Sequence, residues 1–165
     1  MAISHQPMTD EQRKSVALEY LKAFDNGGTT STGGSILDLF ADDAQVHFPK
    51  WGLATGKDAI GRMFGDVGAT LERIVHDYAN FNWIMTGTDT FACEGTSFGE
   101  HQDGAWRAGV SHAGRWCDVF EVRDFLIQRV LHLSRSGLRR TRHRQVSVAG
   151  PRRTRPFSAP EHRSR

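Results

Sequence analysis

The chain has 165 residues, which is long enough for one domain with a hydrophobic core and too short for two ordinary domains. It has only two cysteines, no run of about 18 apolar residues and no basic segment followed by an apolar one at its start. These features argue against a disulfide scaffold, a membrane span and a secretion leader. We therefore expect a soluble, cytoplasmic protein with reduced thiols and no membrane partner.

The formal net charge of +2 is divided unevenly along the chain. Residues 1–133 hold 11 Lys and Arg against 18 Asp and Glu, a charge of −7, whereas residues 134–165 hold 10 Arg against one Glu, a charge of +9. The second segment has too little apolar content to pack, so we expect a domain over 1–133 and a disordered tail over 134–165. Nucleic-acid binding through this tail is the least favoured functional hypothesis.

Helical patterns occupy the first part of the chain. Thr9 and Gln12 have the spacing of a capping box, and apolar residues recur at four-residue steps after them, which predicts a helix that ends at Gly27. A second, short helix is expected over residues 35–40, and a third after Gly56. Between the last two, "AQVHFPKW" alternates as a strand that Pro49 ends.

Long β segments follow, separated by turn signals such as "TGTD", "HQDG" and "VRDF". The expected strands cover residues 73–85, 88–98, 105–122 and 125–133. Helices first and strands afterwards predict an α+β fold, with the helices packed on one face of an antiparallel sheet.

One acidic residue stands within an apolar strand face. Alternation along "GRWCDVFEV" puts Trp116, Asp118 and Phe120 on the same side of the strand. Burial of an unpaired charge costs several kcal/mol. Asp118 therefore lies on the other face, or has a partner such as an Arg or a Tyr hydroxyl, or is kept neutral for a function.

The order of "ALEYLKAFD", "LFADDAQVHFP", "GKDAI" and "GRWCDVFEVRDFLIQRV" resembles the nuclear transport factor 2-like (NTF2-like) superfamily, and most closely its SnoaL-like branch. The resemblance covers roughly residues 9–131. It implies a cystatin-like cone, made of a curved sheet wrapped by three helices, whose mouth takes an apolar small molecule, usually in a homodimer. Members include ketosteroid isomerases, polyketide cyclases and binding proteins without chemistry.

The resemblance also implies roles for individual residues. Ketosteroid isomerase uses a general base together with a Tyr and an Asp that its apolar site keeps protonated. Tyr20 and Asp118 fall at the Tyr and the protonated Asp, and Phe48 occupies the position of the base. The usual isomerase route is thus disfavoured, whereas cyclase chemistry through Asp118 is compatible with Phe48. We expect Asp118 and Tyr20 to be catalytic if the protein is an enzyme.

Further residues are expected to contact the ligand. His47 is a candidate replacement for the missing base, although alternation turns it away from Phe48. In "HDYANFNW", His76 and Tyr78 are expected on a polar surface or dimer contact, and Trp83 on a cavity wall. The expected ligand-binding set is Phe24, Phe48, Trp83, Trp116, Phe120 and His47. No spacing suggests a metal site, and no cofactor is expected.

The Arg-rich tail departs from the endings of SnoaL-like proteins. With suitable codons, "HLSRSGL" read one nucleotide later gives Ile-Tyr-Leu-Asp-Pro-Asp-Tyr, which resembles such an ending. We therefore expect that the tail is the product of a frameshift near His132, and the coding DNA tests this. Three hypotheses stay open: an acid/base isomerase or cyclase acting on a polyketide-like or steroid-like molecule, a non-catalytic binding or dimerisation module, and a nucleic-acid binder.

Overall fold

The computed structural model describes residues 7–111 and 113–134. The Arg-rich segment, apart from Ser134, lies outside these residues, so the expectations of disorder and of a frameshift are not tested. No helix in the described ranges is long and apolar enough to cross a membrane.

The first helix, α1 (Asp10–Asp25), begins as the sequence predicts. The Thr9 hydroxyl accepts a hydrogen bond from the Gln12 amide at 3.3 Å, and the Gln12 side chain accepts one from the Thr9 amide at 2.8 Å. This reciprocal box satisfies two backbone donors that a helix start leaves free. The helix ends where Gly27 takes a positive φ of 63°.

Only two α-helices are found in the described residues, so the expectation of three is wrong. The third expected helix is α2 (Lys57–Gly68), but the second is a single 3-10 turn, η1 (Ile36–Leu39). Ser35 caps this turn as expected. The turn cannot lengthen, because Phe40 begins a strand and is paired with Ile127.

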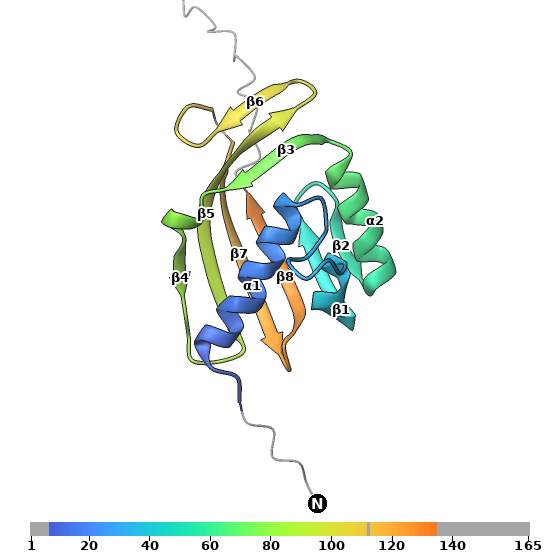
Figure 1. The fold of residues 1–165 in the computed structure, drawn as a ribbon, viewed down its shortest axis with the longest axis vertical. Coiled ribbons are helices and arrows are strands. Elements are labelled where there is room, and N and C mark those ends of the chain that lie inside the picture. The colour runs from blue at the N-terminus through green and yellow to red at the C-terminus, as the bar shows by residue number, and fades with distance from the viewer. Residues whose placement is uncertain (1–6, 112, 135–165) are drawn as a thin grey trace, which may run out of the picture.

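Eight strands in the described part of the chain form one curved, unclosed sheet (Figure 1). They are β1 (Phe40–Phe48), β2 (Gly52–Thr55), β3 (Leu71–His76), β4 (Asn82–Ile84), β5 (Thr90–His101), β6 (Gly104–Arg107), β7 (Arg115–Arg123) and β8 (Leu126–Ser134). The order is β2-β1-β8-β7-β5-β3, and β4 and β6 also pair with β5. The expectation of a purely antiparallel sheet is wrong at one place, since β1 and β8 are parallel.

Two of the expected long strands are interrupted. A 3-10 turn, η2 (Tyr78–Asn80), separates β3 from β4, and residues 108–114 separate β6 from β7. The first break matters for the site, because regular alternation does not continue through η2. His76, expected on a polar surface, is instead buried on the inner side.

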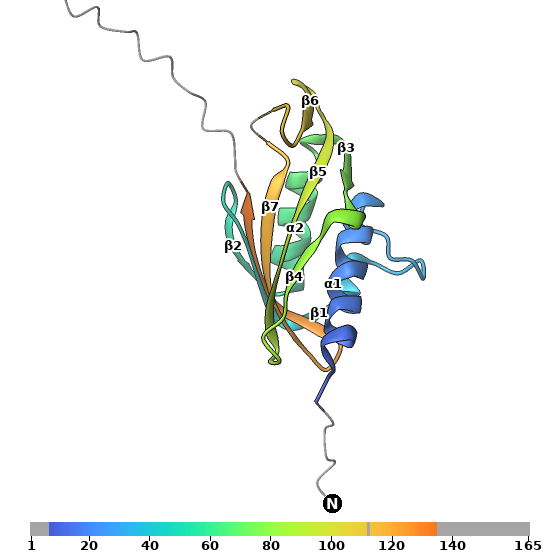
Figure 2. The same cartoon turned by 90° about the vertical axis from the view of Figure 1, so that its left-hand side faces the viewer.

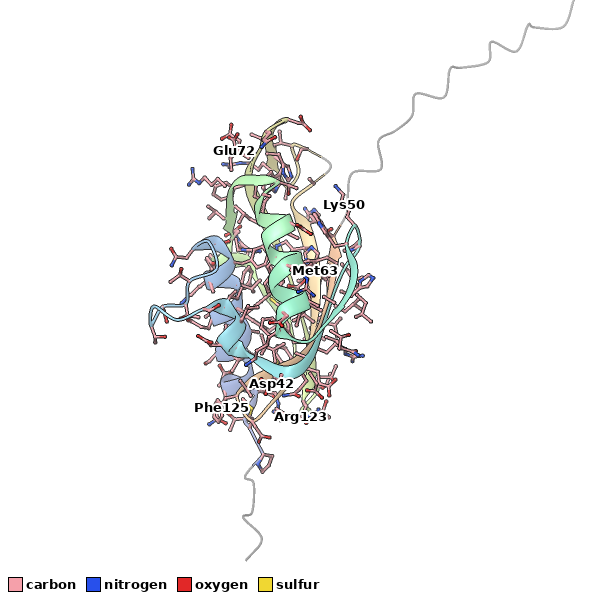
Figure 3. The ribbon with its side chains drawn as sticks, turned by 90° about the vertical axis from the view of Figure 1, so that its right-hand side faces the viewer. Asp42, Lys50, Met63, Glu72, Arg123 and Phe125 are labelled. Carbon is pink, nitrogen blue, oxygen red and sulfur yellow. The ribbon has the colours of Figure 1, made fainter. Side chains whose placement is uncertain are left out.

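Both α-helices lie on the same side of the sheet (Figure 2). α1 packs against β3, β7 and β8, and α2 packs against β1 and β2. The core fills the layer between helices and sheet, with Tyr20, Phe40, Phe91 and Phe120 among its largest fully buried side chains. Figure 3 shows α2 in front of the sheet, with Asp42 and Lys50 towards opposite ends of the molecule.

Candidate functional site

A cavity of about 320 Å³ opens between the helices and the inner face of the sheet. This volume is at the lower end of the range for small-molecule sites. Aromatic and aliphatic side chains supply most of the wall. The polar or charged side chains that border the cavity are Tyr20, Lys50, Thr70, His76, Ser97, His101, Arg115, Asp118, His132 and Ser134, with the Trp106 and Trp116 indoles beside them.

Asp118 lies on the inner face of β7 and is only 2 % exposed. Its carboxyl oxygen Oδ1 is 2.6 Å from Nδ1 of His132, its neighbour across the β7–β8 pair. Asp118 is therefore on the expected face and has a partner, which is a histidine rather than an Arg or a Tyr. A carboxylate behind Nδ1 fixes the tautomer of an imidazole and leaves Nε2 to accept or donate a proton.

The ring of His132 is held in place by Phe48. The two ring centroids are 4.6 Å apart and the planes are nearly perpendicular, at 88°. Phe48 also contacts Phe24 and Trp51, which continue the apolar wall. The imidazole thus meets an apolar environment beside the cavity while its Nδ1 keeps a hydrogen bond.

Tyr20 stands at the inner end of the cavity. Its ring contacts Phe24, Phe40, Phe64 and Phe120, each with centroids 5.7 to 6.2 Å apart. Burial, and next the charge of nearby Asp118, raise the pKa of Tyr20 well above its ordinary value. The hydroxyl therefore keeps its proton at neutral pH. It makes no hydrogen bond to any described residue, so it is a donor available to a ligand oxygen.

A second histidine borders the cavity from β3. Nδ1 of His76 is 2.5 Å from Oδ1 of Asp25, and the His76 amide donates to Oδ2 of Asp25 at 2.9 Å. The Tyr78 hydroxyl donates to the same Oδ2 at 2.5 Å. Burial by itself would raise the pKa of Asp25, but the bonds and charge interaction with His76, with help from Tyr78, outweigh it and lower the pKa. Burial, the bond to Asp25 and its charge raise the pKa of Tyr78.

Trp116, on β7, contacts the second of these histidines, His76. Its ring is 5.2 Å from the His76 ring, and it stands two residues before Asp118 on the same strand face. The indole is 6 % exposed, and its Nε1 has no hydrogen-bond partner among the described residues. A buried N–H without a partner costs about 1–3 kcal/mol.

The structure brings together five of the eight predicted site residues, since Tyr20, Phe24, Phe48, Trp116 and Asp118 border the cavity. The other three do not border it. Phe120 is fully buried beneath Tyr20, and Trp83 packs on Phe81 and Phe91. His47 pairs with Leu53 and Leu131 on the opposite face of the sheet, as alternation indicated.

Sequence reasoning missed His132, His76 and Asp25. In the structure Asp25 is the last residue of α1 and His76 the last of β3. The sequence predicted a helix to Gly27 and a strand over residues 73–85, so neither residue stood at the end of a predicted element. Among the described residues, Asp118 is also the only carboxylate that borders the cavity, whereas Lys50 and Arg115 border it without an ion-pair partner in those ranges. No cluster suited to a metal ion occurs in the same ranges.

The sequence model of the SnoaL-like domain family matches residues 17–130. No curated protein matches the sequence.

Solved structures share the fold at low identity. An NTF2-like protein from Anabaena variabilis is 19% identical, with a TM-score of 0.60 over 79% of this chain and 95% of that one. A candidate polyketide cyclase from Xanthomonas campestris pv. campestris is 18% identical, with a TM-score of 0.57 over 74% and 89%. TerC, co-crystallised with polyporic acid, is 17% identical, with a TM-score of 0.57 over 74% and 91%. The chain therefore belongs to the SnoaL-like domain family and has the NTF2-like fold.

Proposed function

We propose that the protein binds a hydrophobic, oxygen-bearing molecule of polyketide or steroid type in the cavity and moves a proton on it. The observation that carries this proposal is the 2.6 Å pair of Asp118 and His132 at the wall of an apolar cavity. An imidazole so placed can remove a proton from a carbon next to a carbonyl group. Cavities of this kind with a few convergent polar groups are the usual form of small-molecule sites.

In this proposal the acid/base role passes from Asp118 to His132. Asp118 borders the cavity beside the ring and acts as a positioning residue, which orients Nε2 and stabilises the imidazolium that forms. Phe48 stands where ketosteroid isomerases carry a base. It packs on the His132 ring, which in this proposal takes over the role of that base. Tyr20, whose hydroxyl keeps its proton, supplies a donor for the oxygen on which negative charge develops.

The family supports this class of ligand. One structural neighbour is a candidate polyketide cyclase, and another was co-crystallised with polyporic acid. The alternative is a binding protein without chemistry, which the same apolar cavity would serve.

The test is the rate at which the full-length protein exchanges the α-protons of 1-tetralone for deuterium in heavy water, followed by NMR. We expect exchange by the wild type and a loss of about 10²-fold in Asp118→Asn and in His132→Gln. Because the two residues act as a unit, the double variant should be no slower than either single one. Asp43→Asn, which changes an exposed carboxylate, is the control.

Each hypothesis gives its own outcome in this test. A probe that raises the melting temperature but does not exchange its α-protons supports the hypothesis of a binding protein without chemistry. If no compound in a panel of aromatic ketones and steroids binds or is exchanged, both the enzyme hypothesis and the binding-module hypothesis are contradicted.

We also propose that the protein forms a homodimer through the face of the sheet that lacks helices. Cross-strand partners Ile84, Ala92, Val119, Leu131, His47 and Leu53 form one row across β4, β5, β7, β8, β1 and β2. The end residues Ile84 and Leu53 are 48% and 61% exposed. A row of this kind, flanked by the Glu121–Arg129 pair, can pack against a second copy of itself.

A further inference from the structure

Exposed apolar side chains and cations surround the mouth of the cavity. The apolar side chains are those of Trp51, Val110 and Leu133, which are 37%, 84% and 47% exposed. The cations are Lys50 and Arg115, both exposed. We call these five residues the mouth patch. We propose that the mouth patch docks on an anionic lipid surface, so that the cavity opens towards the membrane. This inference goes beyond the function proposed above.

The ends of several strands bring the mouth patch together. Lys50 and Trp51 lie in the β1–β2 turn and border the cavity, as does Arg115, the first residue of β7. Val110 lies in the connection between β6 and β7, whose last two residues also border the cavity. Leu133 is near the end of β8, which lies beside the β1–β2 turn because β1 and β8 are paired (Figure 2).

Trp51 has the properties of a residue at a membrane interface. It is the most exposed of the four tryptophans, and its ring leans on Phe48, with the centroids 6.4 Å apart. An indole joins an apolar body to a polar N–H group, which suits the boundary between acyl chains and headgroups. The free side of the Trp51 ring is therefore available to lipid.

The two cations of the mouth patch are available to lipid phosphates. Neither Lys50 nor Arg115 forms an ion pair with any described residue. Each Lys or Arg close to an anionic membrane surface adds to the attraction, and long basic side chains can reach the headgroups while their stems contact apolar groups.

The distribution of charge favours this orientation of the molecule. Residues 1–133 carry a net charge of −7, which anionic lipid repels. Figure 3 shows Asp42 towards the end of the molecule away from Lys50. Glu72, Glu100 and Asp103 share the end that holds the mouth patch, but they lie on β3 and the β5–β6 hairpin and do not border the cavity. Contact through the mouth patch keeps most carboxylates away from the lipid.

The chain leaves the described part of the structure beside the mouth patch. Ser134, the last residue of β8, borders the cavity. Residues 135–165 hold 10 Arg against one Glu, a charge of +9, so a large positive charge is attached at this point. Nucleic acid would attract the same charge, but the exposed apolar side chains around the mouth favour a lipid surface.

Such a contact departs from the expectation of no membrane partner. That expectation rested on the lack of a spanning segment, whereas a surface contact needs only apolar side chains at the acyl boundary and cations at the headgroups. A mouth that faces lipid lets an apolar molecule pass from the membrane into the cavity without exposure to water.

The test measures binding of the full-length protein to vesicles of phosphatidylcholine with or without phosphatidylglycerol. We expect binding to the vesicles that contain phosphatidylglycerol, and quenching of tryptophan emission when brominated phosphatidylcholine is included. Trp51→Phe keeps an aromatic ring, so it should bind as the wild type does and lose most of the quenching. This pair of results assigns the inserted ring to Trp51.

Variants separate the mouth patch from the Arg-rich segment. Trp51→Ser should weaken vesicle binding by about tenfold, and Arg115→Ala by about fivefold. The matched controls are Phe125→Ser, at a ring that is 56% exposed at the opposite end of the sheet, and Arg62→Ala, at an exposed cation of α2. Both controls should bind as the wild type does. Circular dichroism and melting curves check that each variant folds.

Three outcomes overturn the proposal. If vesicles bind without quenching, and Trp51→Ser and Arg115→Ala bind as the wild type does, the Arg-rich segment alone holds the protein on lipid. If no vesicle binds, the patch is not a lipid contact. If the two variants weaken binding to a single-stranded oligonucleotide but not to vesicles, the occupant is nucleic acid. The vesicle test uses no cavity ligand, so its outcome is independent of the tetralone exchange test.

Discussion

The layer between the helices and the sheet is solid at one end and hollow at the other. At the solid end, Phe40, Phe91 and Phe120 are fully buried and contact other rings. At the hollow end, His76 and Trp116 border a cavity. The His76 ring has one hydrogen-bond partner, and the Trp116 indole has none among the described residues. Tyr20 touches both ends. The contrast teaches that one continuous core can provide stability through its packed rings and leave its polar groups for a ligand.

The largest expected effect is the loss of packing at the solid end. Phe120→Ala removes a ring that stacks on Phe91 at 5.5 Å and meets Tyr20 edge-on, so it should destabilise the protein by about 3–5 kcal/mol. Urea denaturation measures this. Phe125→Ala, at a ring that is 56% exposed, is the control and should cost about 0.5 kcal/mol or less. A small loss of stability in Phe120→Ala would contradict the division of the core into a packed end and a hollow end.

The outer face of the sheet offers the next largest effect. Leu131→Asp puts a charge in the row of cross-strand partners on this face, so it should weaken the proposed dimer by about 100-fold, or about 2.7 kcal/mol. Sedimentation velocity across a concentration series measures the dissociation constant. Ser15→Asp, which adds the same charge at an exposed position of α1 on the other side of the sheet, is the control. A wild type that stays monomeric at all concentrations would refute the homodimer.

Asp25 should make the hollow end sensitive to acid. Its pKa is lowered in the folded protein, so its ionised form stabilises the fold above the unfolded pKa, and this contribution is lost as the pH falls through the folded pKa. Asp25→Asn should be less stable than the wild type by about 1.5–3 kcal/mol at pH 7, and the gap should shrink in acid. Denaturation at several pH values below 5 measures it. A constant gap would contradict this role.

The smallest effect is expected at the boundary between the two ends. Tyr20→Phe keeps the ring contacts and removes a hydroxyl without a partner among the described residues, so stability should change by about 0.5 kcal/mol or less. Affinity for a ketone ligand should fall by about 0.5–1.5 kcal/mol, which calorimetry can measure. Tyr78→Phe is the contrasting variant, because its hydroxyl bonds Asp25. Equal stability losses in both would show that Tyr20 has a structural partner.

The sequence predicted those parts of the fold that depend on local signals. The capping box of α1 and the alternation of β7 are local, and both are confirmed. η2 breaks the alternation after β3, and nothing local announces that break, so His76 was placed on the wrong side. The parallel pairing of β1 with β8 joins segments far apart in the chain, which no local pattern encodes.

The partner of Asp118 was missed for a geometric reason. The β7–β8 turn has Asp124 and Phe125 at positive φ, with Arg123 opposite Leu126. Counting back from this turn in regular register would place Leu131 opposite Asp118. A bulge between Glu121 and Val122 in the pairing shifts the register by one residue and brings His132 there instead. One extra residue thus exchanges an apolar neighbour for an imidazole.

The parallel pairing of β1 with β8 also has a consequence for biosynthesis. β1 ends at Phe48, but its partner β8 begins only at Leu126, so the middle of the sheet cannot close until most of the domain has left the ribosome. Such non-local contacts slow folding and keep a strand edge unprotected during synthesis. Recombinant yield should therefore depend on chaperones and on growth temperature more than it does for proteins whose strands pair with their immediate neighbours.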